Sequence, residues 1–319
     1  MDRNLALEFV RVTEAAAIAA SKWIGRGEAK RADGAAVDEM RKRFNQIDFR
    51  GTIVIGEGSK DEAPELYAGE KVGQGWSSGF KKNEVFDLAV DPLECTDSVA
   101  FGRYNAMSVI ASGSKGSLLS APDTYMEKLA VGPKAVKAVK LGAPVKMNLE
   151  KTARALNKKV KDLTVCVLDR ERHKDLILQI RKSGARVRLI TDGDVAAAVA
   201  TCLPESGIDM LLGIGASAES VLAGTAVKIL GGQLFARFSP LKDSHKELLK
   251  NAGLKDSKVY SVSDLCKGRI LTFTATGIID GPLLEGIKTY NNAVVTHSIV
   301  IRGMSGTVRY ITTYHNKKN

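Results

Sequence analysis

The chain has 319 residues and a formal net charge of +11, from 47 Lys+Arg against 36 Asp+Glu. Its 44% hydrophobic and 26% charged content is typical of a globular protein and argues against a disordered chain or a fibre. No apolar stretch approaches the roughly 20 residues that span a bilayer. Asp2, Glu8 and Arg11 interrupt the apolar run that a signal peptide would need. We therefore expect a cytoplasmic protein of one large domain or two ordinary ones.

The cysteines and the positive charge exclude further classes. The four cysteines include no CxxC pair, which excludes a zinc ribbon and argues against a disulfide framework. The basic residues are scattered, and the 6% aromatic content leaves no base-stacking platform beside them. A small anionic substrate fits the charge as well as nucleic acid does, so the charge alone does not decide between them.

Apolar residues at helical spacing predict helices over 4–24 and 34–44, with Asp33 as the N-cap of the second. Runs rich in β-branched residues predict strands over 51–56 and 85–91, and Pro92 is expected to close the latter. Further strands are predicted at the end of this region, over 106–111, 117–119 and 126–131. This half therefore reads as a mixed sheet with helices.

After Lys140 the chain alternates between strand and helix patterns. Strands are predicted over 163–169, 186–191 and 208–214, and helices over 149–157, 171–183, 194–202 and 217–230. This alternation is typical of a mainly parallel sheet covered by helices. The last part adds strands over 270–276, 294–301 and 307–313. The Gly/Pro/Lys-rich stretch 132–148 is the expected boundary, which gives an α+β domain over 1–145 and an α/β domain over 146–319.

Acidic residues recur where a predicted strand ends or a predicted helix begins, at Asp33, Glu57, Asp61, Asp91, Glu94 and Glu219. Any one of them is explained as a helix cap or a turn residue. The sequence DPLE (91–94) is more telling, because its proline fixes a turn in which both carboxylates and the Leu93 carbonyl can face one cation. Hard oxygen ligands of this kind suit Mg²⁺ or Mn²⁺.

Six segments together resemble the class II fructose-1,6-bisphosphatases, which belong to the magnesium-dependent, lithium-sensitive sugar and inositol phosphatases. They are IGEGSKDEAP (55–64), AVDPLECTDS (89–98), SAPDTYMEKLAVGP (120–133), RERHKDLI (170–177), DGDVAAA (192–198) and ATGIIDGPLLEGIK (275–288). The resemblance runs from residue 1 to about 315 with the motifs in the same order. The superfamily's DPLE-x-T motif and an acid–helix–GG element, from Glu219 to Gly231-Gly232, are also present.

The resemblance implies a layered α/β/α/β/α sandwich that hydrolyses the 1-phosphate of fructose 1,6-bisphosphate in gluconeogenesis. It implies Mg²⁺ or Mn²⁺ as cofactor and a homodimer or homotetramer, with no nucleic-acid or membrane partner. The implied metal ligands are Asp33, Glu57, Asp91, Glu94 and Glu219. Asp61 and Thr96 would activate the attacking water, and the backbone at Cys95 and Thr96 would hold the reacting phosphate. The implied contacts to the sugar and its second phosphate are Tyr125, Arg170, Arg172, Asp192 and Asp194.

Several positions depart from the family pattern, and two of these departures lie beside expected site residues. Cys95 stands where the family usually has glycine, and would be strained if the position needs a positive φ. Ser217-Ala218-Glu219-Ser220 replaces the usual APEG, losing its proline and glycine. His173 lies beside the two arginines, where a packing or surface role is at least as plausible as a functional one.

Three rival functions are weighed against this reading. A dinucleotide-binding protein is suggested by GIGASAES (213–220), which lacks the third glycine of that motif. A sister phosphatase would act on sedoheptulose 1,7-bisphosphate or inositol phosphates. A non-catalytic sugar-phosphate-binding relative would explain Cys95 and Ser220, but the five retained carboxylates argue against it.

Overall fold

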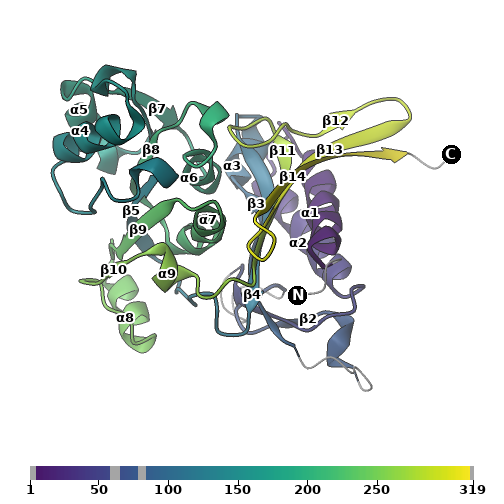
Figure 1. Cartoon of the computed structure of the whole chain (residues 1–319). Helices are drawn as coiled ribbons and strands as arrows, with labels where there is room; N and C mark the ends of the chain where they lie inside the picture. Colours follow the sequence, from purple (N-terminus) through teal and green to yellow (C-terminus); the bar gives the residue numbers. More distant parts are fainter. Residues whose placement is uncertain (1–4, 58–64, 78–83, 317–319) are drawn as a thin grey trace. The chain divides into compact units, whose positions relative to one another are not determined.

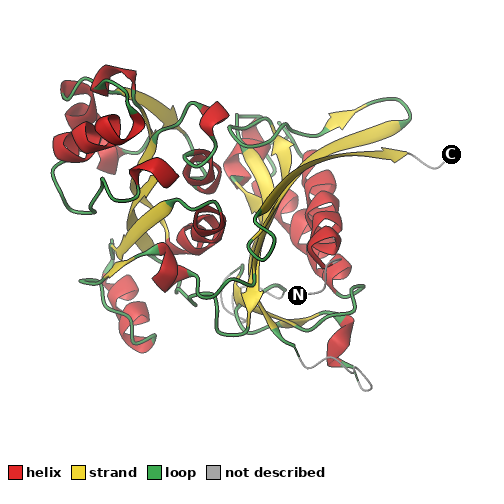
Figure 2. Cartoon of the chain, viewed as in Figure 1, coloured by secondary structure: helices red, strands yellow, loops and turns green. Residues whose placement is uncertain are grey.

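The computed structural model describes residues 5–57, 65–77 and 84–316, and the chain forms two compact units, each built on its own sheet (Figures 1 and 2). One unit comprises Met1–Ser120 and Lys267–Asn319, and the other comprises Ala121–Cys266. This division differs from the single boundary expected within 132–148. The reason is strand pairing: β11 (Leu271–Ile279) runs antiparallel to β4 (Ala106–Ser114), so the last part of the chain completes the first sheet.

The first unit holds an eight-stranded sheet in the order β12-β13-β11-β4-β3-β1-β2, with β14 paired to β13. Helices α1 and α2 pack against each other; α1 lies along β11 and β13, and α2 lies against β3. The rings of Phe9, Phe44 and Phe49 meet in the core that these helices cover. Besides β4 and β11, the elements of this unit have these bounds: α1 (Leu5–Ser21), α2 (Ala29–Phe44), α3 (Thr96–Phe101), β1 (Gly51–Ile55), β2 (Lys71–Val72), η1 (Gln74–Trp76), β3 (Phe86–Glu94), β12 (Lys288–Thr289), β13 (Ala293–Arg302) and β14 (Thr307–Asn316).

The second unit holds a six-stranded sheet in the order β10-β9-β5-β8-β6-β7. Helices α4 and α5 cover one face, and α6 and α7 cover the other (Figure 1). Its strands are β5 (Tyr125–Val131), β6 (Thr164–Leu168), β7 (Arg186–Ile190), β8 (Met210–Ala216), β9 (Gln233–Phe238) and β10 (Val259–Tyr260). Its helices are α4 (Val145–Leu156), α5 (Lys174–Lys182), α6 (Val195–Ala200), α7 (Ser217–Ile229), α8 (Asp243–Asn251) and α9 (Val262–Leu265), with 3₁₀ turns η2 (Pro133–Ala135), η3 (Val160–Asp162), η4 (Glu171–His173) and η5 (Pro204–Ser206).

The predicted α/β class is confirmed, but the second sheet is mixed rather than mainly parallel. Only β6 pairs in parallel, with β7 and with β8. The sheet is mixed because β5 runs antiparallel to both β8 and β9, and β10 runs antiparallel to β9. Between them the two units supply two sheets and the helical layers that cover them. None of the helices described combines the length and hydropathy needed to cross a bilayer.

Three local predictions were wrong for physical reasons. Helix α2 begins at Ala29, so Asp33 lies inside it rather than capping it; the preceding Ala32 is buried and extends the packed face. Strand β3 continues through Pro92, because its register with β4 shifts between Asp91 and Glu94 and such a bulge tolerates proline. Over 117–119 the structure has only an isolated bridge at Leu118 rather than a strand, and the Leu118 N–H donates to the Asp87 carboxylate at 3.2 Å.

Candidate functional site

The first group of candidate residues centres on two acids of the first unit, Asp33 in α2 and Glu57 just after β1. Burial, and then the charge of Asp33, raise the pKa of Glu57 to about 7. Burial also raises the pKa of Asp33. Two partly buried carboxylates that repel one another are the arrangement a divalent cation relieves, so this pair fits a metal site.

The DPLE segment lies at the end of β3, beside the bulge. Glu94 is buried, and the Asp91 carboxylate accepts a hydrogen bond from the Leu93 N–H at 3.1 Å. The Thr96 hydroxyl donates to the Leu93 carbonyl at 3.2 Å. The segment therefore has a defined shape in which Asp91 and Thr96 are both tied to Leu93.

Cys95 occupies the position between these acids and helix α3, and its backbone is left-handed with φ of 74°. The side chain is buried, and the Asn105 amide lies 3.6 Å from its Sγ. The conformation that only glycine adopts without cost is therefore required here. The sequence predicts a strained Cys95 if its position needs a positive φ, and the backbone there has a positive φ.

The structure brings only some of the expected metal ligands together. Within residues 5–57, 65–77 and 84–316, no three His, Cys, Asp or Glu side chains gather into a ready-made site. Asp33 and Glu57 interact directly through their charges. Asp61 lies outside the described residues, and Glu219 belongs to the second unit.

The second group lies along one edge of the second sheet. Because β6, β7 and β8 are parallel, their carboxyl ends share this edge, and the antiparallel β5 begins there, with Tyr125 opposite Ala216. This topology places the expected substrate contacts close together. They are Tyr125 at the start of β5, Arg170 and Arg172 after β6, Asp192 and Asp194 after β7, and Glu219 in the first turn of α7.

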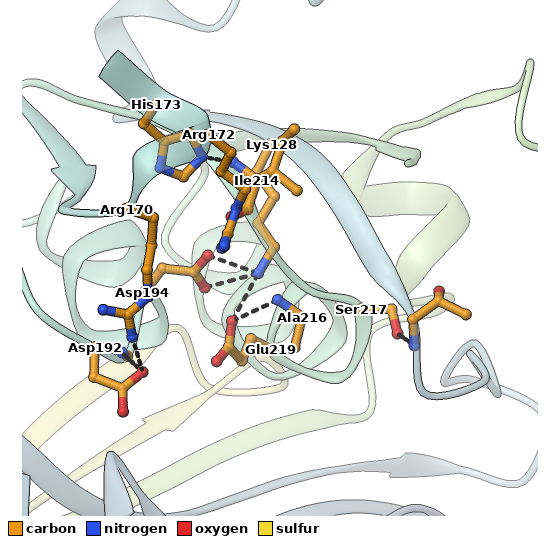
Figure 3. Close-up of polar contacts among 12 residues, drawn as sticks. Lys128, Arg170, Arg172, His173, Asp192, Asp194, Ile214, Ala216, Ser217 and Glu219 are labelled. Atoms are coloured by element: carbon orange, nitrogen blue, oxygen red, sulfur yellow. Dashed lines mark hydrogen bonds and ion pairs between the residues drawn. The ribbon is translucent and has the colours of Figure 1, made fainter. Parts of the chain in front are cut away.

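A buried lysine joins two of these acids (Figure 3). Lys128 is 1% exposed, and its ammonium donates to the two Asp194 oxygens at 2.8 and 2.7 Å and to Glu219 Oε2 at 3.0 Å. Burial lowers the pKa of Lys128, but the two carboxylates raise it overall, so the ammonium stays charged. Burial and the Glu219 charge raise the pKa of Asp194. One cation thus holds two acids that the sequence assigned to different tasks.

Glu219 also stabilises the start of its own helix. Its Oε2 accepts a hydrogen bond from the Ala216 N–H at 3.1 Å, and the hydroxyl of Ser217 accepts one from the Thr124 N–H at 3.1 Å (Figure 3). The helix start is therefore held by side chains in a segment that lacks the family's proline and glycine.

The two arginines take different partners. Arg170 lies 3.6 Å from the Asp192 carboxylate. Arg172 stacks over the Tyr125 ring at 5.3 Å, and its Nε and Nη2 donate to the Ile214 carbonyl at 3.2 and 2.7 Å. The adjacent His173 is buried, and its ring nitrogens bond to the Leu168 carbonyl and to the Ile214 N–H. Figure 3 shows the bond to Ile214. The edge thus presents positive charge and hydrogen-bond donors that suit an anionic ligand.

Comparison with known proteins identifies the chain. The family described as "Bacterial fructose-1,6-bisphosphatase, glpX-encoded" matches residues 3–315. The chain belongs to this family. It is 45% identical to fructose-1,6-bisphosphatase 1 class 2 of Escherichia coli (strain K12) over 328 residues, covering 99% of this chain and 96% of the relative. It is 44% identical over 336 residues to the D-fructose 1,6-bisphosphatase class 2/sedoheptulose 1,7-bisphosphatase of Synechococcus sp. (strain JA-3-3Ab), covering 99% and 97%.

Among solved structures, the inositol monophosphatase of Anabaena (Nostoc) sp. PCC 7120 aligns with this chain at 14% identity. The alignment covers 80% of this chain and 98% of that one, with a TM-score of 0.37. A likeness at this level carries no further argument. The family assignment rests on the sequence matches alone.

The sequence alone does not indicate the hydrogen-bond partners of Lys128 and His173. Lys128 stands in the apolar run of β5, and a lysine buried in a strand requires an acidic partner. That signal was available, but the partners, Asp194 and Glu219, are 66 and 91 residues away. For His173 the sequence left a packing or surface role at least as plausible as a functional one, because its partners are main-chain atoms of Leu168 and Ile214, which no side-chain motif reveals.

Proposed function

We propose that this chain is a metal-dependent phosphatase that converts fructose 1,6-bisphosphate to fructose 6-phosphate and phosphate. The observation that carries the reaction is the family match over residues 3–315. Net charge of +11 favours an anionic substrate. The reaction belongs to gluconeogenesis, and we further propose a cytoplasmic homodimer or homotetramer.

The proposed cofactor is Mg²⁺ or Mn²⁺, held by Asp33, Glu57, Asp91, Glu94 and Glu219. The partly buried Asp33–Glu57 pair supports this, because burial and the charge of Asp33 raise the pKa of Glu57, and a bound cation would favour the charged carboxylates. When bound, a divalent ion polarises the phosphoryl oxygens and lowers the pKa of a coordinated water. The oxygen-only donor set is the one that these hard cations prefer.

The reacting phosphate is proposed to lie against the start of α3. There the backbone N–H groups of Cys95 and Thr96 donate to phosphate oxygens, and the Thr96 hydroxyl with Asp61 orients the attacking water and removes its proton. The buried DPLE segment supports this role because its bonds to Leu93 fix Asp91 and Thr96 in place. Bonds that hold a site before the substrate arrives reduce the cost of reaching the transition state.

The sugar and its second phosphate are proposed to contact Tyr125, Arg170, Arg172 and Asp192. Arg172 has its guanidinium already anchored on Ile214 and Tyr125, which supports a preorganised anion contact. Asp194 is only 3% exposed and bonded to Lys128. We therefore propose that it influences substrate binding by holding Lys128, which in turn holds Glu219.

A second substrate is sedoheptulose 1,7-bisphosphate, favoured by the Synechococcus relative, which is named for both sugars. The test is phosphate release by the purified protein from each bisphosphate, with fructose 6-phosphate as the control for positional selectivity. We expect release from fructose 1,6-bisphosphate and little from fructose 6-phosphate. Equal rates on all three sugars would contradict selective hydrolysis of the 1-phosphate.

A further inference from the structure

The side chains of Arg172 and His173 both form hydrogen bonds with the backbone of Ile214 in β8 (Figure 3). His173 Nε2 accepts a hydrogen bond from the Ile214 N–H at 2.7 Å, and Arg172 donates through Nη2 to the Ile214 carbonyl at 2.7 Å. The other ring nitrogen of His173, Nδ1, lies 2.8 Å from the Leu168 carbonyl. Because one partner is a donor and the other an acceptor, the ring is neutral with its proton on Nδ1.

The local shape of β8 is adapted to this ring. Gly213, immediately before Ile214, has φ of 141°, and a Cβ added there would lie 3.1 Å from His173 Nε2. A side chain at position 213 would therefore crowd the ring that bonds to Ile214. The imidazole is only 2% exposed, so its two hydrogen bonds are not exchanged for water.

The hydrogen bonds to the Ile214 carbonyl matter for Arg172 because this side chain is long and exposed. Without the Ile214 carbonyl, its guanidinium would sample many rotamers. With the carbonyl in place, Nε and Nη2 are fixed and the guanidinium is held over the Tyr125 ring. The carbonyl belongs to Ile214 of β8, whose backbone is held both by pairing with Glu127 of β5 and by the hydrogen bond from its own N–H to His173.

We propose that His173 is a positioning residue for Arg172: by bonding the Ile214 N–H, it aims the Ile214 carbonyl that anchors the arginine. This rests on the proposed function, in which Arg172 binds the second phosphate of the substrate. In this proposal His173 itself touches neither the substrate nor the metal. Its effect is on substrate affinity and passes through Ile214 and Arg172.

Two substitutions separate the two bonds of the ring. In His173→Asn the amide can still donate to Leu168 but cannot reach Ile214; in His173→Gln the longer side chain can present its oxygen to the Ile214 N–H. We expect His173→Asn to raise the KM for fructose 1,6-bisphosphate about 5- to 10-fold with kcat within about 2-fold, the pattern of lost uniform binding. We expect His173→Gln to restore KM to within about 2-fold of the parent.

The same substitutions in an Arg172→Ala background distinguish positioning from general support of the fold. If His173 acts through Arg172, His173→Asn causes no further rise in KM in that background. An equal rise in KM in both backgrounds would overturn the proposal, as would an unchanged KM in the His173→Asn single variant. A fall in both kcat and thermal midpoint that is the same in His173→Asn and His173→Gln would also overturn it. An Arg172→Ala protein with unchanged KM would overturn the assignment of Arg172 to the substrate, and the positioning role with it.

Discussion

Lys128 donates a part-buried hydrogen bond to Glu219 at 3.0 Å, and the same ammonium donates two buried hydrogen bonds to Asp194. The residue comes from the middle of β5, whereas its partners stand at the starts of α7 and α6. One cation therefore ties the central strand to the two helices that cover this face of the sheet. A single substitution should test how much of the second unit depends on it.

Lys128→Met would leave two carboxylates near each other without their cation. Breaking a buried ion pair from one side typically costs about 3–5 kcal/mol, because the remaining charge is desolvated and unpaired. We expect a loss of this size in the free energy of urea unfolding, measured in EDTA. Adding Asp194→Asn should recover part of the loss, since it removes one of the stranded charges. A single-variant loss below about 1 kcal/mol would show that the bonds contribute little.

Glu57→Gln tests the repulsion between Asp33 and Glu57. Since burial and Asp33 raise the pKa of Glu57 from 4.5 to about 7, its charge destabilises the metal-free fold, and stability is lost as pH rises from 4.5 through 7. Glu57→Gln removes that charge. We expect the metal-free variant to gain about 1–2 kcal/mol over the parent at pH 8 and much less at pH 5.

The matched control for this pair is Asp38→Asn, which removes an exposed carboxylate from the same helix. It should change the free energy of unfolding by less than about 0.5 kcal/mol at either pH. Adding Mg²⁺ should stabilise the parent and Asp38→Asn but have a reduced effect on Glu57→Gln. A gain in Glu57→Gln that is the same at both pH values would contradict a raised pKa as its cause.

Cys95 offers a test of backbone strain. A non-glycine residue in the left-handed region costs about 1–2 kcal/mol, and a β-branched residue costs more. We expect Cys95→Gly to keep or raise the thermal midpoint, with relief of strain offsetting the lost Sγ packing, and Cys95→Val to lower it by several degrees. Equal midpoints for the two variants would contradict strain at φ of 74°.

Much of the fold could be predicted because local patterns carried it. The apolar spacing of 4–24 and the β-branched run 51–56 gave elements within a few residues of α1 and β1. What failed depended on distant partners. The antiparallel place of β5 between β8 and β9 is set by strands more than 75 residues later in the chain, since β8 begins at Met210. The return of β11 to the first sheet likewise has no local signal.

The candidate site divides in the same way. The sequence motifs indicated the residues at the edge of the second sheet, and the structure brings Tyr125 together with Arg172 and Arg170 with Asp192. A lysine in the apolar run of β5 signals an acidic partner, but the sequence does not indicate that Lys128 bonds both Asp194 and Glu219. Such ion pairs form when elements pack across a sheet, because a buried charge without an oppositely charged partner costs free energy. The metal-ligand set stays a prediction.

The most direct test of the central claim is phosphate release from fructose 1,6-bisphosphate by the purified protein in Mg²⁺, in Mn²⁺ and in EDTA. Glu94→Gln is the paired variant, because it changes one proposed ligand, which is buried, without changing its size. The account predicts release with at least one metal, none in EDTA, and a loss of at least about 100-fold in Glu94→Gln with its fold retained. Equal release in EDTA, or near-normal turnover by folded Glu94→Gln, would contradict it.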